Sequence, residues 1–195
     1  AVAERMAREL GQPVVVENRP GGATAVANTA AAQARPDGHT LLMHHIGLAA
    51  AATLYRKLPF SVTESFAPLG LASEAAMTLV ARPGFPARDL RGYMEALRRD
   101  KDKLNLATAG LSSAANLCGL LLQQAAGAQA TIVVFRGTAP AIAELMAGRI
   151  DMLCDQATNT VPYIRDGRVA AFGVSSPQRL PGLPDLPTAA EMGFP

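Results

Sequence analysis

A segment of small and hydroxyl-bearing residues, 104–117, carries the pattern with the clearest chemical meaning. It reads as an apolar strand, then a turn that contains Gly110, Ser112 and Ser113, and then the start of a helix. Backbone N–H groups in the first turn of a helix have no acceptor inside the helix and lie at the positive end of its dipole. Glycine lets a ligand approach the backbone, and serine hydroxyls add donors. The pattern therefore predicts a binding site for a carboxylate or a phosphate.

The same pattern recurs in residues 131–141, where an apolar strand leads through Arg136-Gly137-Thr138 into a helical turn. Two such turns in one small unit favour an anion site. The alternative, that each is an ordinary capped helix N-terminus, stays open. Arg136 is the only strong charge in either turn, so its side chain is expected either to lie beside the anion or to point into solvent.

The elements that would position these turns alternate along the chain between short apolar strands and helices. We expect strands at 13–17, 39–43, 77–81, 104–108, 131–135, 150–154 and 169–174, and helices at 1–10, 23–34, 49–55, 89–99, 160–165 and 188–192. Such alternation is typical of an α/β fold with a mainly parallel sheet. Ligands bind such sheets beyond the carboxyl ends of the strands, which adds Asp155 to the candidate site residues.

Composition excludes several classes of function. The chain has 195 residues, of which 49% are hydrophobic and 17% charged, so it can bury a substantial core. Its net charge is only +2 and it has no Trp, which argues against a nucleic-acid partner. No apolar run is long enough to cross a membrane. Without a P-loop, a GxSxG or HExxH motif, or zinc-type cysteine spacing, neither a cofactor nor a metal is expected.

The cysteines and histidines have modest predicted roles. Cys118 and Cys154 lie in apolar segments, so we expect two small buried core residues and not a disulfide framework. The adjacent His44 and His45 point to opposite faces of an extended strand, so at most one faces a given site, and a metal role is disfavoured. A catalytic cysteine needs a lowered pKa, and nothing in an apolar helix would lower that of Cys118, so a catalytic role is disfavoured.

A series of motifs resembles one known family. The segments are 14–22 (VVVENRPGG), 36–42 (PDGHTLL), 54–60 (LYRKLPF), 65–68 (SFAP), 103–105 with 110–117, 135–141 (FRGTAPA), 145–155 and 186–193 (LPTAAEMG). In this order they resemble the solute receptors of tripartite tricarboxylate transporters, the Bug or TctC family, over essentially the whole chain. The resemblance implies a two-lobed, type II periplasmic-binding-protein-like fold. Each lobe would be a mainly parallel sheet flanked by helices, and the lobes would close on a small carboxylate without chemistry.

The resemblance also implies how the site is divided. We expect a first lobe of 1–76 with 175–195, which is incomplete, and a second lobe of 77–174. The loop at His44 would contribute from the first lobe, and the two turns from the second. With the strand-end rule, the predicted ligand-binding residues are His44, His45, Gly47, Thr108, Gly110, Ser112, Ser113, Asn116, Arg136, Gly137, Thr138 and Asp155. Ser113 and Thr138 are also expected to cap their helices.

The resemblance further implies a periplasmic location, a membrane transporter of the tripartite system as partner, and no cofactor. The family's signal peptide, first strand and a loop that clamps the ligand would precede Ala1, and the end of the first lobe would follow Pro195. Weak carboxylate binding, or none, is therefore expected of these residues alone. Two other functions stay open. One is an α/β enzyme that acts on a small anion through Ser112, Ser113 or a histidine, and the other is the effector lobe of a regulator.

Overall fold

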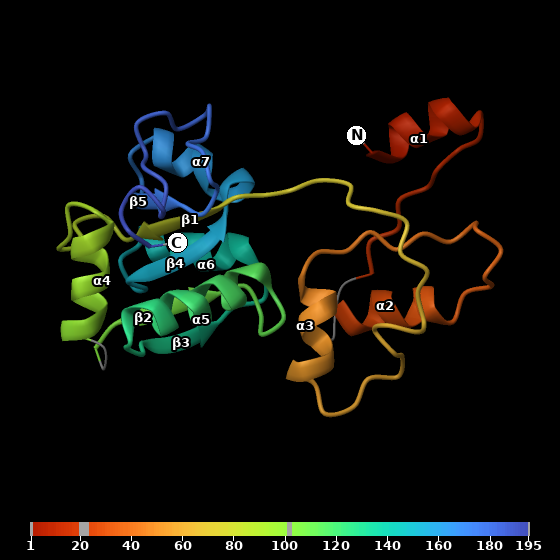
Figure 1. The fold of residues 1–195 in the computed structure, drawn as a ribbon, viewed down its shortest axis with the longest axis horizontal. Coiled ribbons are helices and arrows are strands. Elements are labelled where there is room, and N and C mark those ends of the chain that lie inside the picture. The colour runs from red at the N-terminus through yellow and green to blue at the C-terminus, as the bar shows by residue number, and fades with distance from the viewer. Residues whose placement is uncertain (1, 20–23, 101–102, 195) are drawn as a thin grey trace. The chain divides into compact units, whose positions relative to one another are not determined.

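The computed structural model describes residues 2–19, 24–100 and 103–194. The chain divides into two compact units, Ala1–Met43 with Lys57–Phe66 and His44–Arg56 with Ala67–Pro195 (Figure 1). The turn expected at residues 18–22 lies partly outside the described residues. Within the described ranges, no helix is both long and apolar enough to pass through a membrane.

The larger unit contains the strand–helix alternation that the sequence predicts. Its elements are α3 (Gly47–Leu54), β1 (Met77–Ala81), α4 (Leu90–Arg99), β2 (Asn105–Thr108), α5 (Ala114–Ala126), β3 (Thr131–Val134), α6 (Thr138–Met146), β4 (Met152–Gln156), α7 (Ala157–Arg165) and β5 (Ala170–Val174). Each corresponds to a predicted element. β1 has the predicted bounds, and the ends of the others differ by a few residues, because the last hydrogen bond of an element is not marked in the sequence.

The five strands form one sheet in the order β3-β2-β4-β1-β5. β2 pairs parallel with β3 and β4, whereas β1 pairs antiparallel with β4 and β5. Four strands therefore run in one direction and β1 runs in the other, so the prediction of a mainly parallel sheet is confirmed for this unit with one exception. The sequence does not mark the exception, because a short strand that is buried on both faces has the same apolar pattern in either direction.

Helices cover both faces of the sheet, as alternate burial along the strands requires. On one face, α4 and α5 pack against Leu106 and Cys154. On the other face, α6 and α7 pack against Ala107 and Leu153. Neighbouring residues of the same strand thus contribute to two separate hydrophobic clusters, and the strands are buried from both sides.

The smaller unit contains two helices, α1 (Val2–Leu10) and α2 (Ala25–Ala32), and its described residues form no strand. The strands expected at 13–17 and 39–43 are wrong: neither segment forms regular secondary structure, and Val16 is 67% exposed. An apolar run becomes a strand only where a partner accepts its backbone hydrogen bonds. No such partner lies in the part of this unit that the structure describes.

The chain beyond β5 packs with the sheet. Val174 and Thr188 form a β-bridge, and Ala189 N donates to Val174 O at 2.8 Å. The compact units therefore have boundaries different from the predicted lobes: residues 44–56, 67–76 and 175–195 were assigned to the first lobe but belong to the larger unit. The division of a complete receptor into lobes stays a prediction.

The helix expected at 188–192 is wrong, since Thr188 forms the β-bridge and residues 189–193 form turns. The local signal that suggested it is nevertheless present. Thr188 N donates to Glu191 Oε2 at 2.8 Å, and Glu191 N donates to Thr188 Oγ1 at 3.1 Å. This reciprocal pair is a capping box, but the short stretch after it does not continue as a helix.

Candidate anion-binding site

The carboxyl ends of three neighbouring strands meet at one edge of the sheet. β2 lies between β3 and β4 and runs parallel to both. β2 leads into α5, β3 into α6, and β4 into α7. The N-termini of three helices therefore gather at this edge, and their N–H groups and dipoles make it attractive to an anion.

The connections at this edge leave toward opposite faces. The turn after β2 leads to α5 on one face, whereas the turns after β3 and β4 lead to α6 and α7 on the other. Open α/β sheets bind ligands where neighbouring connections diverge in this way. The two turns selected from the sequence, 109–113 and 135–137, start from adjacent strand ends at this point, where Phe135 N donates to Thr108 O at 2.8 Å.

The turn between β2 and α5 is held by its own side chains. Ser113 Oγ donates to Gly110 O at 2.7 Å and accepts Asn116 N at 3.1 Å, so Ser113 caps α5 as predicted. Thr108 Oγ1 lies 3.1 Å from both Gly110 O and Ser113 Oγ. Asn116 Nδ2 donates to Leu111 O at 2.8 Å. Because these side chains bond within the turn, they shape it and leave recognition of an anion to the backbone.

Backbone donors remain at the start of α5. Within the described residues, the N–H groups of Ala114 and Ala115 have no acceptor. They belong to the first helical turn, whose N–H groups point out of the helix end. Two adjacent N–H groups of this kind suit the two oxygens of a carboxylate.

Thr138 does not cap its helix, contrary to the prediction. Gly137 is the N-cap of α6, with a φ of 115° that favours glycine, and Thr138 is the first helical residue. A glycine cap has no side chain that could accept an N–H group. Among the described residues, the N–H groups of Thr138 and Ala139 have no acceptor, so the start of α6 is open in the same sense as that of α5.

At the third helix start, that of α7, the protein supplies its own anion, the carboxylate of Asp155. Its side chain is 3% exposed, and its Oδ1 accepts Gln156 N at 2.6 Å and Asn159 Nδ2 at 2.9 Å at the start of α7. Its Oδ2 accepts the hydroxyl of Thr138 at 2.7 Å. Because β3 and β4 flank β2, this last bond spans the end of β2. A carboxylate fixed by three donors positions the edge and does not itself attract a second anion.

The loop before α3 contacts the turn 109–113, between β2 and α5. A Cβ on Gly47 would lie 2.1 Å from Ser112 O, so the backbones of α3 and the turn touch directly. At the end of α3, Tyr55 OH donates to Ser112 Oγ at 3.4 Å. The structure thus brings Gly47 and Ser112 together. Two residues of the site are not among those predicted from the sequence. No sequence pattern marks Tyr55. Asn159 follows Asp155 by four positions, a helical spacing that could have revealed it.

His44 and His45 bond locally at the start of α3. His45 N donates to His44 Nδ1 at 2.8 Å, and Gly47 N donates to His45 Nδ1 at 2.9 Å. Partial loss of hydration lowers the pKa of His45, and the adjacent His44 lowers it further. The neutral ring is the form that accepts the N–H of Gly47. The described ranges hold no group of three or more His, Cys, Asp or Glu side chains that could bind a metal ion.

Arg136 precedes the N-cap of α6 and its side chain is exposed. Within the part of the chain that the structure describes, it forms no hydrogen bond or ion pair. An exposed cation beside the open start of α6 can contact a bound anion or stay in solvent. Both predicted alternatives for this residue therefore stay open.

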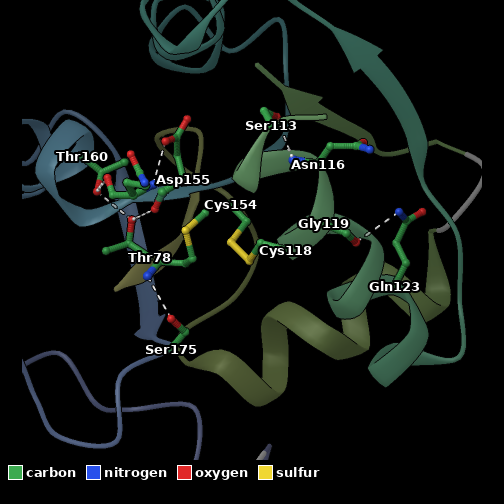
Figure 2. Close-up of a disulfide and its surroundings, with 12 residues drawn as sticks. Thr78, Ser113, Asn116, Cys118, Gly119, Gln123, Cys154, Asp155, Thr160 and Ser175 are labelled. Carbon is green, nitrogen blue, oxygen red and sulfur yellow. Dashed lines mark hydrogen bonds between the residues drawn. A yellow bond between two sulfur atoms is a disulfide. The ribbon is translucent and has the colours of Figure 1, made fainter. Parts of the chain in front are cut away.

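The two cysteines form a disulfide, which corrects the expectation of two separate thiols (Figure 2). Cys118 on α5 and Cys154 on β4 are 36 positions apart in sequence, and their Cα atoms are 5.9 Å apart. α5 packs directly on β4, and this contact between distant segments brings the sulfur atoms together. No local pattern in the sequence records that contact.

Replacing Gly47 with Ala is expected to separate α3 from the turn, because the new Cβ would meet a backbone oxygen that cannot rotate away. The turn at Ser112 would then lose the contact with α3, while the sheet should keep its stability. Ala49→Gly, which leaves that contact intact, is the control. Chemical-shift changes confined to 44–56 and 109–113 in Gly47→Ala would support the contact, and an unchanged spectrum at Ser112 would contradict it.

Comparison with known proteins gives a consistent result. The family model described as the tripartite tricarboxylate transporter family receptor matches residues 1–195. A UPF0065 protein from Agrobacterium vitis is 38% identical over 193 residues, which cover 99% of this chain and 56% of the relative. The chain thus spans little more than half the length of this relative.

Two solved structures share the fold. The periplasmic binding protein BugD is 40% identical with a TM-score of 0.88, and the match covers 99% of this chain and 64% of BugD. MatC from Rhodopseudomonas palustris, solved with bound malate, is 39% identical with a TM-score of 0.88, and the match covers 100% of this chain and 66% of MatC. Both matches extend over essentially all of this chain. The chain therefore belongs to the tripartite tricarboxylate transporter receptor family.

Proposed function

We propose that the protein is an extracytoplasmic solute receptor that binds a small mono-, di- or tricarboxylate without chemistry and presents it to a tripartite tricarboxylate-type transporter. The observation that carries this proposal is the pair of open helix starts, α5 and α6, at adjacent strand ends. Backbone N–H groups at helix N-termini bind carboxylates without a charged side chain. The malate in the related MatC structure supports the same class of ligand.

The proposed ligand contacts are the backbone of the turn 109–115 and of 137–139, with Arg136 beside them. The loop His44–Gly47 contributes through its contact with Ser112. Thr108, Ser113 and Asn116 act by shaping the turn, and Asp155 by fixing Thr138. In this proposal, several of the predicted site residues do not contact the ligand. They hold in place the backbone groups that do.

The bonds of Ser113 and His45 argue against the enzymatic alternative. Ser113 Oγ donates its proton to the carbonyl of Gly110 and accepts an N–H, so it is a cap. The Nδ1 atom of His45 accepts Gly47 N. A serine becomes nucleophilic only when a base accepts its proton, and these bonds give Ser113 a different partner. The family and its solved members are likewise receptors.

The disulfide supports a location outside the cytoplasm, because disulfides persist in oxidising compartments such as the bacterial periplasm. BugD, the structural relative described above, is a periplasmic binding protein. Both observations agree with the periplasmic location that we propose for this receptor.

Calorimetric titration with acetate, malate, adipate and citrate, with NMR of the recovered ligand, tests the proposed function. We expect saturable binding of at least one carboxylate, and each ligand should be recovered unchanged. Inorganic phosphate is the control for a general anion site. Conversion of a carboxylate would indicate an enzyme, and binding of phosphate with no binding of carboxylates would overturn the proposed ligand class.

Ser113→Ala is expected to lower the free energy of unfolding by about 1 kcal/mol, the usual effect of losing a cap. It should also weaken carboxylate binding, because the hydroxyl holds Gly110 and Asn116 in the turn. Asp89→Ala is a matched control, since Asp89 caps α4 by accepting Gly92 N at 2.8 Å, on a helix outside the site. Equal affinities in the two variants at matched folding would reduce Ser113 to a structural cap.

Arg136→Gln is expected to weaken carboxylate binding at low ionic strength and to have less effect as salt is added, because exposed charges are screened. Arg91→Gln removes an exposed arginine from α4 and is the charge-matched control. Titrations at several salt concentrations measure the effect. A salt dependence identical to that of the parent protein would show that the Arg136 side chain points into solvent.

A further inference from the structure

A covalent bond joins two elements of the site close to its anion-binding end (Figure 2). Cys118 is the fifth residue of α5 and Cys154 the third of β4. Cys118 follows the cap Ser113 by five positions, about 7.5 Å along the helix axis. Cys154 directly precedes Asp155. The bond thus lies next to the turn and not at the distant end of the helix.

The part of α5 nearest the site has few large side chains to hold it on the sheet. Its buried residues there are Ala115, Asn116 and Gly119, and Leu122 is the first large apolar side chain to be buried. A Cβ on Gly119 would lie 2.9 Å from Leu106 Cδ2, which shows how closely the helix approaches β2. Small residues allow this approach but bury little apolar area. The disulfide is therefore the main attachment of this end of α5.

Cys154, at the other end of the disulfide, lies next to the residue that fixes the start of α6. Asp155, next to Cys154, holds the hydroxyl of Thr138 at the start of α6 and the N–H of Gln156 before α7. The strand that carries Cys154 therefore also fixes the position of α6. One covalent bond links the second turn of α5, next to the capped start of that helix, to the residues that fix the first turn of α6.

We propose that the Cys118–Cys154 disulfide is a positioning element of the anion site, which holds the starts of α5 and α6 in place so that both contact one carboxylate. This inference rests on the proposed function. Without the bond, α5 keeps its core contacts through Leu122, but its first turn gains freedom. Binding must then order that turn, which lowers affinity. A disulfide that served stability alone would leave the affinity of the folded protein unchanged.

The bond can be opened chemically or by substitution. A phosphine such as TCEP reduces it: the S–S bond accepts two electrons and two protons to give two thiols, and the phosphine takes an oxygen from water to become its oxide. The Cys118→Ala/Cys154→Ala variant removes the bond without a reductant. Agreement between the two forms separates loss of the bond from a side effect of either treatment.

Malate titration of the oxidised protein, the reduced protein and the double variant is the first measurement, at a temperature where circular dichroism shows all three to be folded. We expect at least about a tenfold loss of affinity without the bond, equivalent to about 1.4 kcal/mol. Phe172→Leu, at a position 4% exposed on β5, is the control because it lowers stability away from the site. It should bind malate as the parent does.

Amide hydrogen exchange of the ligand-free protein separates this inference from the proposed function. Opening the bond should speed exchange in 109–117 and leave β5, 170–174, unchanged. Unchanged exchange in 109–117, or equal malate affinity with and without the bond, overturns the positioning role. An oxidised protein that binds no malate overturns malate as the ligand, and exchange in 109–117 then decides the positioning role by itself.

Discussion

Replacing Cys118 and Cys154 together with alanine is expected to lower the free energy of unfolding by about 4 kcal/mol. The disulfide closes a loop between residues 36 positions apart, and a loop of that length restricts the unfolded chain by roughly this amount in the chain-entropy model. Typical domains have a total stability of about 5–15 kcal/mol, so the variant would be close to its stability limit.

Urea unfolding of the oxidised and disulfide-free proteins measures this effect. The dependence on denaturant should also become steeper without the cross-link, because a less restricted unfolded chain exposes more surface. Reduced parent protein is the control and should match the double alanine variant. A loss below about 1 kcal/mol would contradict the prediction and indicate that the unfolded chain is compact without the bond.

Asp155→Ala is expected to destabilise the sheet edge by about 3–5 kcal/mol. The carboxylate accepts hydrogen bonds from Thr138, Gln156 and Asn159 at a position 3% exposed, and each donor would lose its partner. Hydrogen bonds to a charged group contribute about 1.5–3 kcal/mol each, and the losses add incompletely because the donors can relax toward water.

Asp155→Asn is the matched variant for this prediction. Its amide oxygen can still accept from Gln156 and Asn159, and its NH2 group can donate to Thr138 Oγ1 once that hydroxyl rotates. We therefore expect a clearly smaller loss than for alanine, measured by denaturant unfolding. Equal losses in the two variants would show that the negative charge matters more to the edge than the three hydrogen bonds.

The sequence by itself determined the local parts of the site. The two strand–turn–helix segments, the cap at Ser113 and the alternation of elements from residue 77 to 174 all follow from patterns among residues a few positions apart. Those patterns work because caps, turns and amphipathic periods are properties of short segments. The motif order also sufficed to identify the family.

The strand predictions at 13–17 and 39–43 failed for the opposite reason. Their apolar residues are typical of strands, yet a strand also needs a partner, and no local pattern specifies one. The cap predicted at Thr138 failed by one position because Gly137 adopts a φ of 115° that the sequence alone does not reveal. Local preference is decisive only where the surrounding structure agrees with it.

Only the tertiary structure decided how the parts form one site. The Cys118–Cys154 bond and the Thr138–Asp155 hydrogen bond join residues 36 and 17 positions apart, and both depend on β2 lying between β3 and β4. That strand order also lets the Asp155 carboxylate, which lies beside the start of α7 in the sequence, accept the Thr138 hydroxyl at the start of α6. Such contacts follow from the packing of whole elements, so the sequence marked the separate helix starts and only the sheet order brought them to one edge.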